Sequence, residues 1–303
     1  MIAVAPAETD AELEAWRRVR LEVLPEERAP TVTELRGQPA EAMLLLARRD
    51  GQVVGSGFAG RSSHAGFVFV APRVRPAGRR AGAGTALLAR LVAHAAALGA
   101  ESLTAHVDGP DRGSLAFARR FGFSEADRQV EQVRTLGAEE AGPFPDGVEV
   151  ATVAERPELL REAHALAVQG YADMPTPWPA EIGLDEWLRE EATHPEGSFV
   201  ALAGGEVIGY SGLMRDADDP TRAEDGLTAV HPAWRRRGLA TALKRAELAW
   251  AATHGLREIY TWTQRGNEGM RRVNERLGYR YRNVSVTLAA PLSTVQRALG
   301  GRR

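Results

Sequence analysis

The sequence contains Val74-Arg-Pro-Ala-Gly-Arg-Arg-Ala-Gly-Ala-Gly84 and, 156 residues later, Val230-His-Pro-Ala-Trp-Arg-Arg-Arg-Gly-Leu-Ala240. The same offset, without a gap, aligns positions 74–123 with 230–279, and sixteen of these fifty positions are identical. Solenoid repeats have periods of only about 20–50 residues. A repeat of this length therefore indicates a duplicated domain.

The length of the chain agrees with this duplication. Its 303 residues are enough for about two domains, because a domain takes roughly 100–200 residues. The stretch from Ala138 to Gly147 contains several proline, glycine and acidic residues, a composition that is typical of a linker. We therefore expect an N-terminal domain over residues 1–137, a linker over 138–147 and a C-terminal domain over 148–303.

Each copy shows the same order of expected elements. A strand, a helix and a variable segment precede a hairpin, and then follow a strand that runs into the repeated turn, a helix, a strand, a helix and closing strands. Asp50-Gly51 and Gly204-Gly205 supply the positive φ angles that a tight hairpin turn requires. This order predicts a mixed α/β domain that occurs twice.

The composition excludes several kinds of site. Because there is no cysteine, disulfides, zinc–thiolate sites, iron–sulfur clusters and thiol nucleophiles are excluded, and we expect no metal. A net charge of −2 gives no overall electrostatic case for nucleic acid. Residues 1–10 show no signal peptide and the alanine-rich stretch 87–100 is too short to span a bilayer, so we expect a cytoplasmic protein that does not bind membranes. Lys244 is the only lysine among 38 basic residues, a bias that indicates a GC-rich, actinobacterium-like genome.

The repeated turn has the features of an anion site. Its glycines let the backbone approach a ligand closely, and the following helix presents unpaired N–H groups at the positive end of its dipole. A nucleoside-triphosphate loop is excluded because it needs Gly-Lys-Ser/Thr, and a dinucleotide fingerprint is excluded because Leu87 stands where its third glycine would be. We infer a site for a pyrophosphate; the alternative is that the glycines only turn the chain.

Two motifs resemble those of the GNAT superfamily of acyl-CoA-dependent N-acetyltransferases. The first is Arg79-x-x-Gly82-x-Gly84 and Arg235-x-x-Gly238-x-Ala240, and the second is Asn267-x-x-Met270-x-x-x-Asn274-x-x-Leu277-Gly278-Tyr279, with a weaker twin at 111–123. The resemblance covers both copies. The chain as a whole therefore resembles tandem GNAT proteins, an arrangement also found in mycothiol synthases. It implies two domains in tandem, each a mixed, mostly antiparallel twisted sheet flanked by helices.

The resemblance implies that coenzyme A, in the form of acetyl-CoA, binds along the turn. In this family the backbone amides of the turn hold the pyrophosphate, and the preceding strand pairs with the pantetheine arm. Asn267 usually faces this arm in the family, although it can equally be an ordinary helix N-cap. The residues assigned to the cofactor are Thr228, Ala229, Val230, Arg235, Arg236, Arg237, Gly238, Leu239, Ala240 and Asn267 in the second copy and Val74, Arg79, Arg80, Ala81, Gly82, Ala83 and Gly84 in the first.

Amide formation needs a base, because only a neutral amine attacks the thioester. The resemblance implies a glutamate six residues before the valine of the turn, and this position is Glu224 in the second copy but Val68 in the first. The tyrosine that many members use as the acid is replaced by Asn274 and, in the first copy, by Ala118. We therefore assign catalysis to Glu224 and Asn274. The alternatives are a solvated loop carboxylate for Glu224 and an ordinary helix residue for Asn274.

The acceptor is expected against the segment that follows the first helix of the second copy. Asp173 can hold a cationic amine, and Tyr171 and Trp178 can supply flat apolar walls. The alternative is that the tryptophans of this segment anchor the core, which we favour for Trp187. We expect a small-molecule amine as the partner and a monomer or homodimer.

Three functions remain open at this point. The favoured one is transfer of an acetyl group from acetyl-CoA to the primary amine of a small molecule, with chemistry in the second copy. The second is a mycothiol synthase-like acetyltransferase, whose acceptor is the cysteinyl precursor of mycothiol. The third is a non-enzymatic acyl-CoA sensor or partner-binding protein, because both copies lack the tyrosine.

Overall fold

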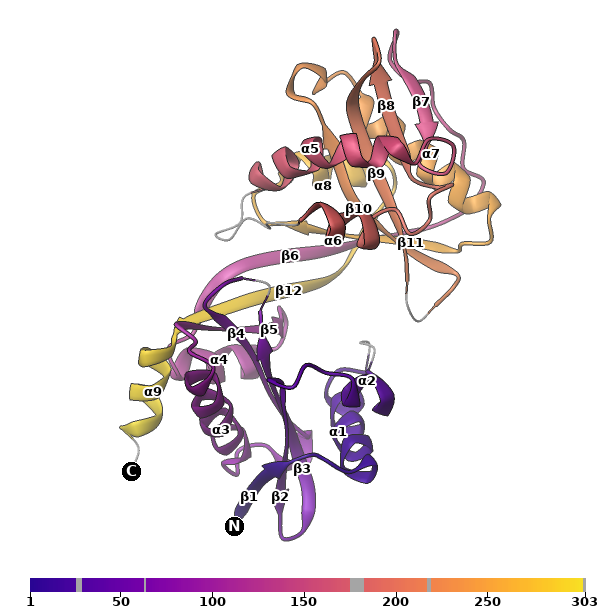
Figure 1. Ribbon diagram of the computed structural model, residues 1–303. Coiled ribbons are helices and arrows are strands. Elements are labelled where there is room, and N and C mark those ends of the chain that lie inside the picture. Colours follow the sequence, from indigo (N-terminus) through magenta and orange to yellow (C-terminus); the bar gives the residue numbers. More distant parts are fainter. Residues whose placement is uncertain (26–28, 63, 175–182, 217–218, 302–303) are drawn as a thin grey trace. The chain divides into compact units, whose positions relative to one another are not determined.

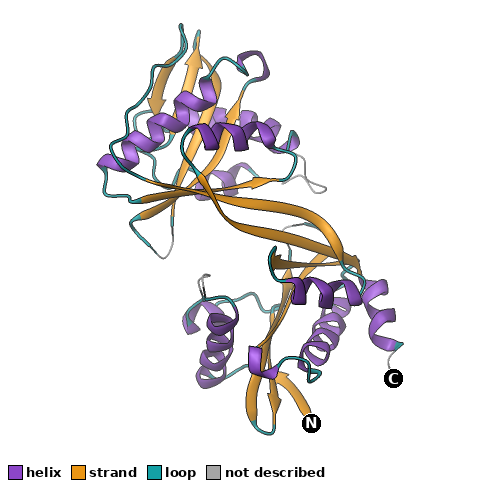
Figure 2. Cartoon of the chain, turned by 180° about the vertical axis from the view of Figure 1, so that it is seen from behind, coloured by secondary structure: helices purple, strands orange, loops and turns teal. Residues whose placement is uncertain are grey.

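The computed structural model describes residues 1–25, 29–62, 64–174, 183–216 and 219–301. The chain forms two compact units, which we call unit 1 (Met1–Ala126 and Val286–Arg303) and unit 2 (Asp127–Ser285). Each unit contains a mixed sheet with helices on both faces (Figures 1 and 2). The predicted α/β fold is therefore confirmed for both copies.

Unit 1 comprises most of the first half of the chain and the C-terminal end. Its elements are β1 (Ile2–Pro6), α1 (Asp10–Val23), α2 (Val32–Arg36), β2 (Met43–Arg49), β3 (Gln52–Arg61), β4 (Phe67–Val74), the 3-10 turn η1 (Pro76–Gly78), α3 (Ala83–Ala97), β5 (Ser102–Asp108), α4 (Arg112–Arg120), the end of β12 (Arg280–Pro291) and α9 (Leu292–Gly300). The strand order is β1-β2-β3-β4-β5-β12, with β4 and β5 parallel. Helices α1 and α3 cover opposite faces of this sheet (Figure 1).

Unit 2 repeats this plan. Its elements are β6 (Ser124–Thr135), β7 (Glu149–Thr152), α5 (Glu158–Ala172), α6 (Leu184–Glu190), β8 (Phe199–Ala203), β9 (Glu206–Arg215), β10 (Arg222–Val230), η2 (Pro232–Trp234), α7 (Leu239–Thr253), β11 (Glu258–Gln264), α8 (Glu268–Arg276) and the start of β12. The strand order is β12-β6-β11-β10-β9-β8-β7, with β10 and β11 parallel. Helix α5 covers one face and α7 the other (Figure 1).

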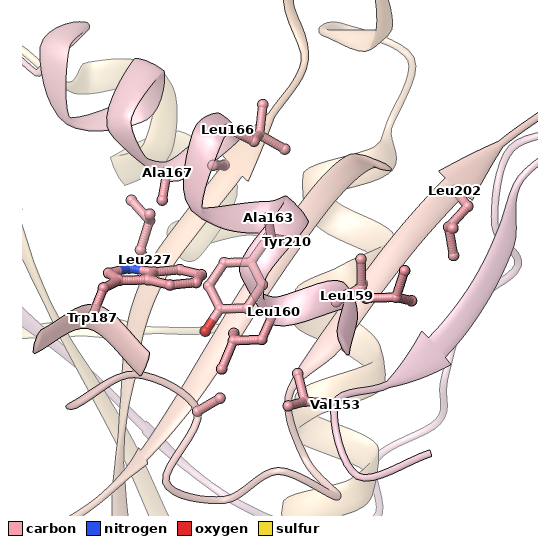
Figure 3. Close-up of a cluster of buried hydrophobic side chains, with 13 residues drawn as sticks. Val153, Leu159, Leu160, Ala163, Leu166, Ala167, Trp187, Leu202, Tyr210 and Leu227 are labelled. Carbon is pink, nitrogen blue, oxygen red and sulfur yellow. The ribbon is translucent and has the colours of Figure 1, made fainter. Parts of the chain in front are cut away.

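The core of unit 2 on the α5 face is built around two large aromatic side chains. Trp187 of α6 and Tyr210 of β9 are fully buried, and their ring centroids lie 5.2 Å apart (Figure 3). Leucines and alanines of α5 surround them, together with Leu227 of β10. The prediction that Trp187 is a core residue is confirmed.

The closing strands divide the chain differently from the predicted boundaries at 137 and 148. β6 begins at Ser124, but from Asp127 onward it belongs to unit 2, where it pairs with β11. β12 begins in unit 2, and from Val286 onward it belongs to unit 1, where β12 borders β5. Each unit thus takes a strand from the other half of the chain. Local sequence cannot specify this exchange, because the alternation of a strand defines its buried face and not its partner.

Candidate active site

The repeated turn has the same backbone in both copies. Between β10 and α7, Arg236 and Gly238 have left-handed φ angles of 63° and 88°. Between β4 and α3, the corresponding Arg80 and Gly82 have φ angles of 65° and 89°. The copies are therefore repeats in structure as well as in sequence, and glycine is needed at the more strained of the two positions.

The N-terminus of α7 is open. Gly238 is its N-cap residue, and no described side chain caps the helix. A Cβ atom built on Gly238 would meet no described atom within 4 Å, and the same holds for Gly82 in front of α3. The unpaired N–H groups and the positive dipole end of such a helix form a suitable site for phosphate groups.

The arginine side chain of each turn binds the strand that precedes it. Arg235 Nε donates to the Val230 carbonyl at 3.0 Å, and Arg79 Nε donates to the Val74 carbonyl at 3.3 Å. Arg235 also donates to Asp173 Oδ2 at 2.5 Å, so this predicted acceptor residue lies against the turn. The Nε groups of Arg79 and Arg235 thus donate to their own strands, and the unpaired backbone amides at the start of α3 and α7 remain as donors for an anion.

Strand β10 separates from β11 before it reaches the turn. The two strands pair only from Arg222, opposite Glu258, to Glu224, opposite Tyr260, although β10 continues to Val230. A bulge interrupts the pairing of β10 with β9 between Asp225 and Thr228. The edge of β10 that faces β11 is therefore unpaired from the bulge to the turn, which suits an extended ligand arm.

Glu224 lies at the last paired position before this separation. Its carboxyl is partly buried and accepts a hydrogen bond from the Tyr260 hydroxyl on β11. Burial raises the pKa of Glu224 to about 7, and the neighbouring carboxyls of Asp225 and Glu191 contribute in the same direction. A carboxyl with this pKa exchanges a proton readily at neutral pH.

A second carboxyl group, which the sequence analysis did not single out, lies on the same side of the sheet. Glu191 follows α6, and its side chain is buried. The Tyr171 hydroxyl donates to Oε1 at 3.0 Å, and the Tyr210 hydroxyl donates to Oε2 at 3.2 Å. Tyr171, predicted as an acceptor wall, therefore lies close to this carboxyl, whereas Trp178 lies outside the described residues.

Asp225 points to the opposite, α7 face of the sheet. It forms a fully buried ion pair with Lys244 of α7 and accepts a hydrogen bond from the Tyr279 hydroxyl at 2.9 Å. Successive residues of a strand face opposite ways, so Glu224 and Asp225 have different environments. Asp225 is a structural residue of this face.

The residue of unit 1 that corresponds to Glu224 is Phe69. The prediction that Val68 holds this position is therefore wrong. Glu224 pairs with Tyr260 and Phe69 pairs with Thr104, which is the repeat partner of Tyr260. The bulge in β10 inserts one residue, so the constant offset of 156 fails upstream of it. The ring of Phe69 packs against the ring of His106, with the two centroids 5.2 Å apart. Unit 1 therefore lacks a carboxylate at this position, as expected.

The last helix of unit 2 contains both predicted asparagines. Asn267 is the N-cap of α8, and its side chain accepts a hydrogen bond from the Met270 amide at 3.3 Å. Asn274 is fully buried and donates to Gln132 of β6 at 3.0 Å. The Asn274 side chain therefore holds α8 to β6, and we do not retain it as a catalytic residue.

A sequence model of the acetyltransferase (GNAT) family matches residues 9–123 and 164–279, one match in each copy. The chain belongs to the GNAT family. It is a tandem GNAT protein and an N-acetyltransferase, as the sequence analysis expected. Within the described ranges, every helix of this GNAT protein is too short or too polar to cross a membrane.

Curated relatives of this GNAT protein are named mycothiol acetyltransferases. A mycothiol acetyltransferase of Nocardia farcinica is 29% identical over 269 residues, which cover 84% of each chain. A mycothiol acetyltransferase of Saccharomonospora viridis is 30% identical over 219 residues, which cover 68% of this chain and 69% of the relative. The relatives are actinobacterial, in agreement with the arginine bias of the sequence.

Solved structures show the same tandem GNAT fold. A GCN5-related N-acetyltransferase from Sphaerobacter thermophilus has a TM-score of 0.78 at 18% identity and covers 96% of each chain. A tandem GNAT protein from the clavulanic acid biosynthesis pathway has a TM-score of 0.72 at 24% identity, covering 96% of this chain and 99% of its own. At these identities the likeness is one of fold.

Proposed function

We propose that unit 2 binds acetyl-CoA and transfers its acetyl group to a primary amine of a small molecule, with Glu224 as the general base. The observation that carries this proposal is the partly buried Glu224 carboxyl, whose pKa of about 7 suits proton uptake at neutral pH. Its place at the separation of β10 and β11 is close to where an arm lying along β10 would end.

The residues of unit 2 fit acetyl-CoA. The uncapped N-terminus of α7 and the open left-handed Gly238 support a pyrophosphate held by the amides of Arg236 to Ala240. Thr228 to Val230, unpaired on the side of β11, offer backbone groups to an extended arm. When bound, acetyl-CoA supplies an activated acetyl thioester.

The chemistry assigned to the chain is the movement of one proton. Glu224 takes a proton from the acceptor ammonium, which frees the nitrogen lone pair for attack on the thioester carbonyl. The carbon–nitrogen bond forms, the carbon–sulfur bond breaks and the CoA thiolate leaves. A thiol has an ordinary pKa of about 8.5, so this thiolate leaves near neutral pH without a dedicated acid such as Asn274.

Unit 1 is assigned a supporting role. The φ angles of Arg80 and Gly82 in its turn match those of the corresponding turn residues of unit 2 within 2°, which supports binding of coenzyme A there. Phe69 in the position of Glu224 provides no base. We therefore propose that unit 1 contributes no chemistry.

Release of free thiol from acetyl-CoA in the presence of a panel of small amines tests the proposal. Because the chain has no cysteine, a thiol reagent detects only coenzyme A. Amine-dependent thiol release, together with a matching mass increase of the amine, supports the proposal. Tight binding of acetyl-CoA with no release for any amine would instead favour the acyl-CoA sensor.

The names of the relatives favour one acceptor for a second candidate function, the acetylation of the cysteinyl precursor of mycothiol. This acceptor carries its own thiol, so its acetylation is followed by mass spectrometry. A kcat/KM for this precursor far above that for other primary amines would identify the chain as a mycothiol acetyltransferase.

A further inference from the structure

The carboxyl of Glu191 is held by two tyrosine hydroxyls. The hydroxyls of Tyr171 and Tyr210 donate to its two oxygens at 3.0 and 3.2 Å. A Cβ atom on Gly212 of β9 would lie 2.8 Å from Glu191 Oε2 and would also collide with the Tyr210 hydroxyl. The absence of a side chain at position 212 therefore makes room for this carboxyl.

The strand register brings Glu191 close to Glu224. Tyr210, Gly212 and Met214 alternate onto the same face of β9, and Glu224 lies directly opposite Met214 on β10. Glu224 is thus the diagonal neighbour of Gly212, and such neighbours lie about 7–8 Å apart. The two carboxyl groups therefore lie on the same face of the sheet, just before β10 and β11 separate.

Unit 1 provides an internal comparison. The hairpin strands of the two copies align at an offset of 154, which places Phe58 at the position of Gly212. Phe58 and Phe69 pack with their ring centroids 6.1 Å apart. Unit 1 therefore has two packed aromatic rings at the positions of Gly212 and Glu224, where unit 2 has room for the Glu191 carboxyl beside the Glu224 carboxyl.

We propose that Glu191 is a positioning residue for acetyl transfer. In its carboxylate form it places a negative charge beside Glu224, which favours uptake of the proton of the acceptor ammonium by Glu224. This inference rests on the proposed role of Glu224 as the base. Burial raises the pKa of Glu191, and the two tyrosine hydroxyls oppose this by stabilising its carboxylate form.

The other ionisable groups near Glu224 come from the remaining elements around it. Asp225 precedes the bulge of β10, Asp216 follows β9, and Tyr260 lies on β11. Asp225 is paired with Lys244, and Asp216 forms an ion pair with Arg222 at 3.5 Å. Glu191 differs from both because the groups that bind its side chain, among the described residues, are the uncharged hydroxyls of Tyr171 and Tyr210.

The test is the pH profile of kcat/KM for the Glu191→Gln variant, which removes the charge and keeps the size. We expect the acidic limb to move to lower pH by at least ~0.5, because Glu224 then loses its proton more easily. Glu191→Asp keeps the charge and should leave the limb near its wild-type position. Glu190→Gln, at the exposed neighbouring position, is the matched control.

Three outcomes separate the possibilities. An activity that falls equally at every pH, with the limb unmoved, would leave Glu191 a purely structural residue and overturn the inference. A Glu224→Gln variant with full activity would instead overturn the proposed function itself. If Glu191→Gln does not fold, the Tyr210→Phe variant replaces it in the test. This variant removes one hydrogen bond to Glu191 and should move the acidic limb in the same direction. An unmoved limb in Tyr210→Phe would also overturn the inference.

Discussion

Lys244 forms a buried ion pair with Asp225, and each side chain is only 1% exposed. Lys244 is the only lysine of the chain, and Asp225 directly follows the proposed base. The Lys244 ammonium also lies 5.6 Å from the centre of the Tyr279 ring, whose hydroxyl donates to Asp225. The pair therefore links α7, β10 and the end of α8 behind the proposed active site.

Removing one partner of this pair should destabilise unit 2. Lys244→Met leaves the Asp225 carboxylate uncompensated in the core, which typically costs about 3–5 kcal/mol. In Lys244→Met/Asp225→Leu both charges are gone, and much of this loss should be recovered. Urea unfolding of the wild type, of Lys244→Met and of the double variant measures the free energy of unfolding of each. If Lys244→Met is as stable as the wild type, the ion pair contributes no net stability.

The buried lysine should also be protected from chemical modification. An amine-reactive reagent should label only the N-terminal amine of the native protein, because Met1 is exposed and Lys244 is not. Peptide mass spectrometry should find modified Lys244 only when urea has unfolded unit 2. Rapid labelling of Lys244 under native conditions would contradict the burial of this pair.

Glu224→Gln should lower kcat by about 10²–10⁴-fold, the usual contribution of a positioned base. Coenzyme A binding, measured by calorimetry, should remain near the wild-type value because the turn is unchanged. Part of the activity should return at high pH, where more of the amine is already neutral. Glu206→Gln, at the exposed first residue of β9, is the control; equal activity of the two variants would remove Glu224 from the mechanism.

Glu224 should also make stability depend on pH. Its pKa is about 7 in the folded chain and near the ordinary 4.5 when unfolded, so the folded state binds its proton more tightly. The stability associated with the protonated group is present below pH 4.5 and is lost as pH rises through 7. Glu224→Gln should therefore be stabilised relative to wild type at pH 8 by at most ~3 kcal/mol, and hardly at all at pH 4. Thermal unfolding at the two pH values measures this, and an identical difference at both would contradict the raised pKa.

The two turn glycines allow a matched comparison between the units. Gly238→Trp should weaken acetyl-CoA binding and turnover, because the side chain enters the space in front of α7 and the left-handed backbone disfavours it. Gly82→Trp imposes the same strain in unit 1 and should leave turnover within a few-fold. Calorimetry and thiol release measure both; a larger loss from Gly82→Trp would assign the chemistry to unit 1.

Much of the fold was predictable because it depends on local chemistry. The hairpin residues Asp50-Gly51 and Gly204-Gly205 have the positive φ angles expected of them. The two turn glycines do as well, since few other residues adopt φ angles near 90° at little cost. The Asn267 cap of α8 is likewise a local hydrogen bond.

The site was predictable only in part, because its side chains come from distant segments. Glu191 lies 33 residues before Glu224, outside every motif, and only the folding of α6 onto β9 brings it to the same face. Asn274 occupies a position that the family motif associates with catalysis, yet the packing of α8 on β6 buries it against Gln132. Long-range packing of this kind leaves no periodic signal in the sequence.

The sequence by itself therefore determined the duplication, the two turns and the presence of a carboxylate in one copy only. The tertiary structure decided which residue of β4 corresponds to Glu224, because one bulge in β10 shifts the register and replaces Val68 by Phe69. It also decided which unit each closing strand completes. Both decisions depend on strand pairing, and pairing joins residues far apart in the chain whose alternation would suit either partner.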